Sequence, residues 1–339
     1  MPASLSRRCF LSFGAATAAG LTLAACGGGG SGPAAATSTP STGGFPVTVD
    51  GTMGPVTIAK APERVVCVGQ FRDIDAAVGL GVVPLAAPDL SSFIPGGLSP
   101  WVKTALAGAA APQLFDTTDS LPFEQIAAQR PDLILGADLS SMEDDYPNLS
   151  RIAPTISPAT GYNKDPWQVT TTRIGAALGR PDKATELVAG AEARIASAKA
   201  ANPGFAGRTF TFGPVQPDGT VATINNEADS SAAFFAQLGM QLAPQVRSLP
   251  PAGIPNRSTI SAEQLNLLDA DVLILTYTAP EARQRIEASE LFTRIPAVQR
   301  GSYVALDLPA ALALAFPSAL SIGYGLDQVM PKLQSALAK

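Results

Sequence analysis

Short apolar runs alternate with segments of helical period along most of this chain. The runs at 65–69, 133–136 and 272–276 are each bounded by turn residues. Between them, apolar side chains recur mostly at three- and four-residue steps. This alternation is typical of strands and helices arranged around a parallel sheet. The pattern therefore predicts an α/β fold.

Two stretches of the chain read nearly alike, which indicates an internal duplication. The Glu-Gln-Ile at 124–126 and the Glu-Gln-Leu at 263–265 are each followed, eight residues after the Glu, by an Asp that opens an apolar run. Leu-Gly pairs precede both copies, at 80–81 and 238–239. The duplication predicts two Rossmann-like lobes, each built on a parallel sheet.

One long helix is predicted between the two lobes. Pro181 suits the first turn of a helix, apolar residues recur from Ala184 to Ala198, and Asn202 with the Pro-Gly after it ends the pattern. About 20 residues at 1.5 Å each span roughly 30 Å, the size of a small domain. We therefore expect three folded parts: an N-terminal lobe at 46–180, a bridging helix at 181–202 and a C-terminal lobe at 203–339.

The first 45 residues differ from the rest of the chain. Arg7 and Arg8 precede an apolar stretch of roughly 15 residues, shorter than the ~20 that a spanning helix needs. This arrangement resembles a twin-arginine export signal, with the general secretory route as the alternative. The Leu-Ala-Ala-Cys that ends at Cys26 resembles a lipobox, in which the Cys becomes the acylated N-terminal residue. We expect a lipoprotein signal at 1–26, a flexible linker at 27–45, and a lipid on Cys26 that anchors the exported protein to the outer face of the cytoplasmic membrane.

Composition excludes several classes of function. The hydrophobic fraction of 46% against a charged fraction of 15% allows a large core. With 23 Lys and Arg against 28 Asp and Glu, and no basic run, nucleic-acid binding is disfavoured. The chain has no histidine, which excludes the usual Ser-His-Asp and Cys-His enzymes, HExxH zinc sites and His-ligated haem. After processing, Cys67 is left without a disulfide partner, and its apolar surroundings predict a core position.

Several short motifs occur in a fixed order along the chain. They are Pro62-Glu63-Arg64-Val65-Val66, Leu80-Gly81-Val82-Val83-Pro84, the Glu-Gln-Ile at 124–126 with Pro131-Asp132-Leu133-Ile134, Arg151-Ile152-Ala153-Pro154-Thr155, and Gly179-Arg180-Pro181-Asp182-Lys183-Ala184. From residue 46 to the C-terminus, this order resembles the helical-backbone class of ABC-transporter substrate-binding proteins, and most of all the actinobacterial iron-siderophore-binding lipoproteins. The resemblance implies a ligand cleft between two lobes, delivery of an iron chelate to an ABC permease, and no chemical turnover.

The repeated Glu gains a second interpretation from this resemblance. In that family one Glu on each lobe pairs with arginines of the permease, and Glu124 and Glu263 fall on those positions. Both are also expected at the start of a short helix, where the helix dipole favours a carboxylate. Docking and helix stabilisation are both compatible with the pattern, and we favour docking because two equivalent carboxylates suit a partner with two basic pockets.

Candidate ligand-binding residues lie in the loops that follow the apolar runs, because ligands of open parallel sheets lie beyond the carboxyl ends of the strands. These residues are Phe71, Arg72, Trp101, Asn225 and Tyr277. Arg72 could hold a carboxylate, catecholate or hydroxamate oxygen, or could pair with a neighbouring Asp. Trp101 and Tyr277 could stack on an organic scaffold, and Trp101 could instead cap a hydrophobic cluster.

A ferric siderophore is favoured as the ligand, because its own oxygens satisfy the metal whereas haem would need a Tyr or Met ligand from this chain. Haem and cobalamin remain alternatives. A carboxylate-dependent extracytoplasmic hydrolase is an alternative of another class, and it requires two carboxylates about 5 to 10 Å apart in one cleft. We expect a monomeric binding protein with no catalytic residue, cofactor or metal ligand of its own.

Overall fold

The computed structural model describes residues 44–252 and 256–339. The lipoprotein signal expected at 1–26, its Cys26, and the linker expected at 27–45 as far as residue 43 lie outside the described residues. Within the described part, no helix combines the length and the apolar character that crossing a membrane requires. Cys67 is buried and carries a free thiol.

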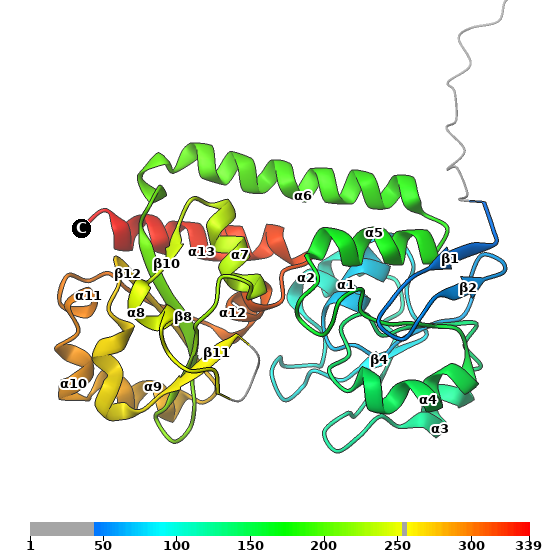
Figure 1. Ribbon diagram of the computed structural model, residues 1–339, viewed down its shortest axis with the longest axis horizontal. Helices are drawn as coiled ribbons and strands as arrows, with labels where there is room; N and C mark the ends of the chain where they lie inside the picture. The colour runs from blue at the N-terminus through cyan, green and yellow to red at the C-terminus, as the bar shows by residue number, and fades with distance from the viewer. Residues whose placement is uncertain (1–43, 253–255) are drawn as a thin grey trace, which may run out of the picture. The chain divides into compact units, whose positions relative to one another are not determined.

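The first lobe, at the right of Figure 1, is built on a parallel sheet with the strand order β5-β4-β3-β6-β7. Its central strands are apolar without interruption, and alternate residues enter different core clusters: Val65 and Cys67 one, Val66 and Val68 the other. Both faces of the sheet are therefore covered, as a parallel sheet requires. The elements are β1 (Val47–Val49), β2 (Val56–Ile58), β3 (Val65–Cys67), α1 (Arg72–Gly79), β4 (Ala86–Pro88), α2 (Pro100–Leu106), β5 (Gln113–Phe115), α3 (Phe123–Ala128), β6 (Leu133–Leu135), α4 (Met142–Ile152), β7 (Thr155–Ile156) and α5 (Trp167–Ala177).

The second lobe has a sheet of order β11-β9-β8-β12-β13, with β10 also paired to β8. Strands β10, β8, β12 and β13 are parallel, as the pattern predicts. Strand β9 is instead antiparallel to both of its neighbours, β8 and β11. The elements are η1 (Pro203–Phe205), β8 (Thr209–Val215), β9 (Val221–Ile224), α7 (Ser230–Gln237), β10 (Gln241–Leu242), α8 (Pro244–Arg247), β11 (Arg257–Ile260), η2 (Ala262–Leu268), β12 (Val272–Tyr277), α9 (Pro280–Glu287), α10 (Glu290–Thr293), α11 (Pro296–Gln299) and β13 (Tyr303–Leu306).

The antiparallel part of this sheet follows from a tight turn. The Pro-Asp-Gly at 217–219 closes the turn with a hydrogen bond from Gln216 N to Thr220 O, and Gly219 has a φ of 88°. So short a connection can only place β9 antiparallel beside β8, since parallel neighbours need a crossover of a dozen or more residues.

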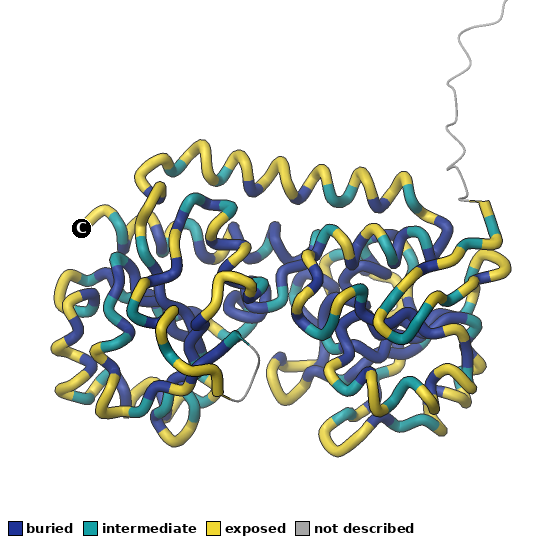
Figure 2. Tube along the Cα trace, viewed as in Figure 1, coloured by how far each residue is buried: buried dark blue, intermediate teal, exposed yellow. Residues whose placement is uncertain are grey.

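Two helices belong to the cores of both lobes. The long helix α6 (Pro181–Ala201) contributes Ala184 to the first core and Ala191 and Ile195 to the second, while most of its surface is exposed (Figure 2). The helix α12 (Leu308–Ala315) contributes Leu312 and Ala313 to the first core. Its other buried residues, Ala310, Ala311, Leu314 and Ala315, belong to the second core, and α13 (Ser321–Leu337) follows it.

The packing of α5 against α6 depends on one glycine. A Cβ on Gly175 would overlap the Cβ of Ala184 and would lie 3.3 Å from the carbonyl oxygen of Arg180. We therefore expect Gly175→Ala to lower the free energy of unfolding by about 1–3 kcal/mol. Gly190 on α6 is the matched control, because it is exposed and has nothing within 4 Å of its Cβ position. Gly190→Ala should raise stability by about 0.5–1 kcal/mol. Urea denaturation of both variants measures this, and equal effects would contradict the close packing.

Candidate functional site

Two adjoining cavities lie at the carboxyl edge of the first lobe's sheet, where the loops after β3, β5, β6 and β7 meet. The larger has a volume of about 580 Å³ and the smaller about 270 Å³. They share the lining residues Leu139, Ser140, Ser141 and Asp144. The larger is also lined by Thr52, Met142, Glu143, Pro158, Thr160, Gly161, Tyr162 and Lys164, and the smaller by Val68, Gln70, Thr117, Asp119, Ser120, Leu121 and Asp145.

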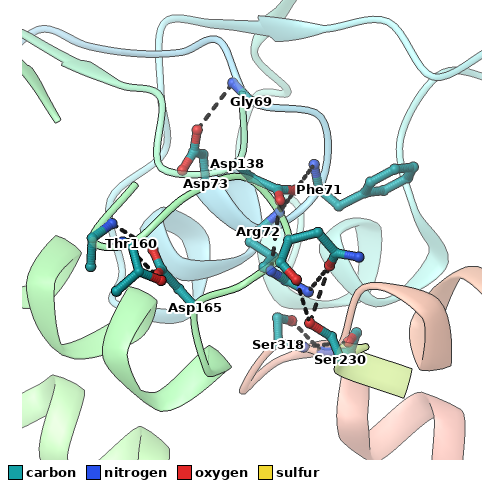
Figure 3. A network of polar contacts seen from close by, with 12 residues as sticks. Gly69, Phe71, Arg72, Asp73, Asp138, Thr160, Asp165, Ser230 and Ser318 are labelled. Carbon is teal, nitrogen blue, oxygen red and sulfur yellow. Dashed lines mark hydrogen bonds and ion pairs between the residues drawn. The ribbon is translucent and has the colours of Figure 1, made fainter. Parts of the chain in front are cut away.

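Arg72, the first residue of α1, is buried beside these cavities with 3% of its surface exposed. Its Nη2 donates to Asn163 Oδ1 at 2.8 Å, and its Nη1 lies 3.8 Å from Asp138 Oδ1 (Figure 3). Asp138 is itself fixed, because its Oδ2 accepts from the backbone N–H groups of Phe71 and Arg72, each at 3.2 Å. The guanidinium is therefore held from two sides by groups of its own lobe.

The loop between β7 and α5 lines the larger cavity and has its shape set by Asp165. This carboxylate accepts from Ala159 N at 2.5 Å, from Thr160 N at 2.8 Å and from Thr160 Oγ1 at 2.6 Å (Figure 3). The same loop carries Tyr162 and Asn163, the latter with a φ of 54°. Burial raises the pKa of Tyr162 to about 12, and the charge of Asp138 adds to this, while Arg72 and Arg257 oppose it. Its hydroxyl is therefore protonated at neutral pH.

Hydrogen bonds and a ring contact join the two lobes next to the larger cavity. Ser230, at the start of α7, donates to Asn163 Oδ1 at 3.1 Å, so that Asn163 accepts from both lobes (Figure 3). Ser318, between α12 and α13, donates to Asp75 Oδ2 at 2.6 Å. Phe71 stacks on Phe316 with ring centroids 4.6 Å apart. The larger cavity thus opens beside the contact between the lobes.

A second buried ion pair lies on the other side of this contact. Arg257, at the start of β11, is 6% exposed, and its Nε lies 3.5 Å from Asp229 Oδ2. Asp229 caps α7 by accepting from Ser231 N at 2.8 Å. Asp229 is followed by Ser230, which donates to Asn163 between Tyr162 and Lys164 of the cavity lining, so this pair lies near the larger cavity.

Three buried carboxyl groups surround the start of α1. Burial raises the pKa of Asp73 to about 8, and the charge of Asp138 raises it further. Burial also raises the pKa of Asp75 to about 7, against the hydrogen bonds from Ser318 and Trp101. The pKa of Asp138 is raised by burial but held down by Arg72 and two backbone donors. Arg72 is the largest of the causes that lower the pKa of Asp138, and its Nη1 lies 3.8 Å from that carboxyl.

Phe71, Arg72 and Trp101 are gathered by the fold around α1. Phe71 is buried against Phe316. Trp101 is also buried, donates its Nε1 hydrogen to Asp75 at 2.8 Å, and has its ring 5.3 Å from that of Tyr324. These side chains pack on the first-lobe side of the contact between the lobes.

Asn225 and Tyr277 lie in the second lobe and make contacts within it. Asn225 is buried and donates to Leu249 O at 3.0 Å and to Ser258 Oγ at 2.8 Å. Tyr277 is partly buried, shares a hydrogen bond with the hydroxyl of Tyr303, and has the guanidinium of Arg283 5.8 Å from its ring centroid. The structure does not bring these two residues to the three around α1.

Glu124 and Glu263 are both exposed, each in the first turn of a short helix that precedes a buried strand. A hydrogen bond from Ser261 lowers the pKa of Glu263. Both side chains are free to meet a partner.

Sequence reasoning missed Asn163, Ser230, Ser318 and Arg257. Asn163 lies in a run of turn residues after β7, so the loop rule that selected Phe71 and Arg72 would also have selected it. Ser318 carries no comparable signal, because its partner Asp75 lies 243 residues away in the sequence.

A family model described as "Periplasmic binding protein" matches residues 95–309. No curated protein matches this chain in sequence. A periplasmic solute binding protein from Mycobacterium smegmatis has a similar structure, with a TM-score of 0.73 and 30% identity, covering 86% of this chain and 98% of the other.

Two further solved structures are similar along most of their length. PiaA from Streptococcus pneumoniae in complex with ferrichrome has a TM-score of 0.73 and 25% identity, covering 86% of this chain and 98% of the other. SirA from Staphylococcus aureus complexed with staphyloferrin B has a TM-score of 0.70 and 21% identity, covering 85% and 98%. The last similarity concerns the fold alone.

The buried carboxyl of Asp73 makes stability depend on pH. Its folded pKa of about 8 lies above the ~3.9 of an unfolded chain, so the folded state binds more protons between about pH 4 and pH 8. Its contribution to stability is complete below that window and is lost as the pH rises through it. We expect Asp73→Asn, which keeps an oxygen acceptor for Gly69 N, to lose less stability than the wild type between pH 5 and pH 8.

Thermal denaturation at several pH values measures this difference. Asp116→Asn is the control, because Asp116 is exposed and its pKa is lowered by Thr118, so its removal cannot flatten the same slope. Parallel curves for the wild type and Asp73→Asn would show that Asp73 does not titrate in this window.

Proposed function

Because this chain belongs to the periplasmic binding protein family, we propose that it binds a ferric siderophore outside the cytoplasmic membrane and delivers it to an ABC importer without chemical turnover. The similar PiaA is named an iron uptake ABC transporter substrate-binding protein and was solved with ferrichrome. The chain has no histidine, and a siderophore surrounds iron with its own oxygens. The protein then needs only to recognise the outside of the chelate.

The observation that carries this proposal is the pair of adjoining cavities at the carboxyl edge of the first sheet. Their volumes of about 580 and 270 Å³ fall around the range typical of small-molecule sites. All their lining residues belong to the first lobe, and the larger includes Tyr162 and Lys164, which flank the Asn163 that meets Ser230 of the second lobe. The chelate lies over Ser140 and Tyr162, whose protonated hydroxyl donates a hydrogen bond to it.

The five residues selected from the sequence take different parts in this proposal. Phe71, Arg72 and Trp101 are all buried around α1, so their proposed part is to hold the neighbouring site in position. Arg72 acts by orienting Asn163 toward the second lobe. Asn225 and Tyr277 shape the second lobe through contacts with its own residues.

Glu124 and Glu263 are proposed to dock the protein on the permease. Each carboxylate is exposed on a different lobe, so one partner with two basic pockets can engage both at once. A lipid on Cys26 would keep the protein at the membrane where that partner resides, with the linker after it giving the reach. The expected monomer suits this arrangement, because one copy already presents both carboxylates.

Chelate binding should depend on the lining that the two cavities share. Titration of the purified chain with a ferric trihydroxamate should quench the fluorescence of Trp101 and Trp167, whereas haem and cobalamin should not compete. Ser140→Trp places a large side chain in the shared lining and should weaken binding by at least about tenfold, or ~1.4 kcal/mol.

The matched control is Ser197→Trp, which fills a surface groove between α6 and α13 instead. It should bind as the wild type does. If Ser140→Trp binds the chelate with wild-type affinity, the binding site does not include these cavities. If the protein binds haem more tightly than every ferric chelate, haem is the ligand.

Docking should depend on both repeated carboxylates and not on ligand affinity. We expect Glu124→Arg combined with Glu263→Arg to abolish uptake of the radiolabelled iron chelate by cells, because two attractive contacts become repulsive, while the Kd of the purified protein is unchanged. Glu290→Arg is the control, since Glu290 is also exposed in the first turn of a helix. Normal uptake by the double variant would leave the helix dipole as the reason for the repeated Glu.

A further inference from the structure

We propose that the site selects ferric chelates of low net charge, the ferric trihydroxamate class, and discriminates against ferric complexes with several negative charges. The inference rests on the proposed function and adds to it the chemical class of the ligand. It derives from the pairing of the charged residues around the larger cavity.

Two buried arginines lie near Asn163, which is flanked in the lining by Tyr162 and Lys164, and each is paired with a buried carboxylate. Arg72 donates to Asn163 directly, and the partner of Arg257, Asp229, precedes the Ser230 that also donates to Asn163. Arg72 comes from the first lobe and has Asp138 at 3.8 Å, and Arg257 comes from the second lobe and has Asp229 at 3.5 Å. All four side chains are at least nine-tenths buried. Each pair therefore presents almost no net charge to a ligand in the cavity.

Neither carboxylate can move aside to free its arginine. Asp138 accepts from two backbone N–H groups, those of Phe71 and Arg72. Asp229 accepts from Ser231 N as the cap of α7. Displacing either one would leave backbone donors and a buried carboxylate without partners, which is costly. An anionic ligand thus cannot take over these guanidinium groups.

The exposed lining of the cavities adds negative charge. In the larger cavity Lys164 is outnumbered by Glu143 and Asp144, and the smaller is lined by Asp119, Asp144 and Asp145. A ligand with several negative charges would meet repulsion from these carboxylates, and no arginine is among the residues that line either cavity. A neutral or weakly positive ligand would meet neither obstacle.

Siderophore classes differ in the net charge of their ferric complexes. Three hydroxamate anions cancel the charge of a ferric ion, whereas three catecholate dianions leave an excess of three negative charges. Hydroxamate complexes still present carbonyl and N–O oxygens, which accept hydrogen bonds from hydroxyls such as those of Tyr162 and Ser140. The lining therefore matches the neutral class in charge and in hydrogen bonding.

The test uses one chelate with a variable side group. Ferrioxamine B and its N-acetyl and N-succinyl derivatives share one ferric trihydroxamate core and carry one positive charge, none and one negative charge. Ferric enterobactin supplies a tris-catecholate trianion. Fluorescence titration of the purified chain at constant low ionic strength should give the tightest binding for the positive and neutral forms. The succinylated form should bind more weakly, and the trianion weaker still, by a total factor on the order of ten or more.

Two variants test whether the buried ion pairs determine this order of affinities. Asp138→Asn and Asp229→Asn keep an oxygen for the backbone donors but leave Arg72 or Arg257 uncompensated. Each should shift the ratio of succinylated to acetylated affinity toward the anion by several-fold. Asp327→Asn, which alters an exposed pair with Arg194 on α6, changes the net charge equally and should leave the ratio unchanged.

Each result has a distinct meaning. Tightest binding of the anions, or equal affinity across the series, overturns the charge selection while leaving chelate binding intact. If the Asn variants do not fold, the affinities of the wild-type protein for the chelate series test the charge selection by themselves. Absence of binding by any ferric chelate overturns the proposed function itself, and the charge selection with it.

Discussion

The apolar contact between the lobes fixes the position of the polar groups that join the lobes beside the larger cavity. Helix α12 places Leu312 and Ala313 in the first core and its other buried side chains in the second, and Phe316 at its end stacks on Phe71. The lobes cannot separate at this point without exposing apolar surface from both cores to water. The contact thereby sets the distance across which Ser318 meets Asp75 and Ser230 meets Asn163.

Burial at this contact also explains the unusual ionisation of the carboxyl groups around α1. A side chain that is removed from water beside an apolar core favours its neutral form unless a partner stabilises the charge. Asp138 has that partner in Arg72, whereas Asp73 has no cation at comparable distance among the ion pairs of the described residues. Arg72 thus opposes the effect of burial on the pKa of Asp138, whereas burial raises the pKa values of Asp73 and Asp75 to about 8 and about 7.

Features that depend on local pattern could be predicted from the sequence, and features that depend on distant contacts could not. The repeated Glu and Asp mark α3 with β6 and η2 with β12, because a short helix followed directly by a buried apolar strand is encoded in one continuous stretch of sequence. The long helix was equally visible in its period. The antiparallel strands β9 and β11 departed from the expected parallel order, although the Pro-Asp-Gly turn before β9 carried the signal. The partner of Trp101 had no local signal, because its hydrogen bond to Asp75 joins different helices.

Arg72 illustrates why residue type alone does not determine the chemistry of a site. A guanidinium just beyond a buried strand is well placed to hold an anion, and its position at the carboxyl edge of the sheet follows from the sequence. Its available charge depends instead on Asp138, whose carboxylate is turned toward it by the two backbone N–H groups at the start of α1. The same backbone that presents Arg72 therefore also binds the group that neutralises it. The charge that Arg72 presents is thus a property of the loop geometry, because that geometry places Asp138 beside it.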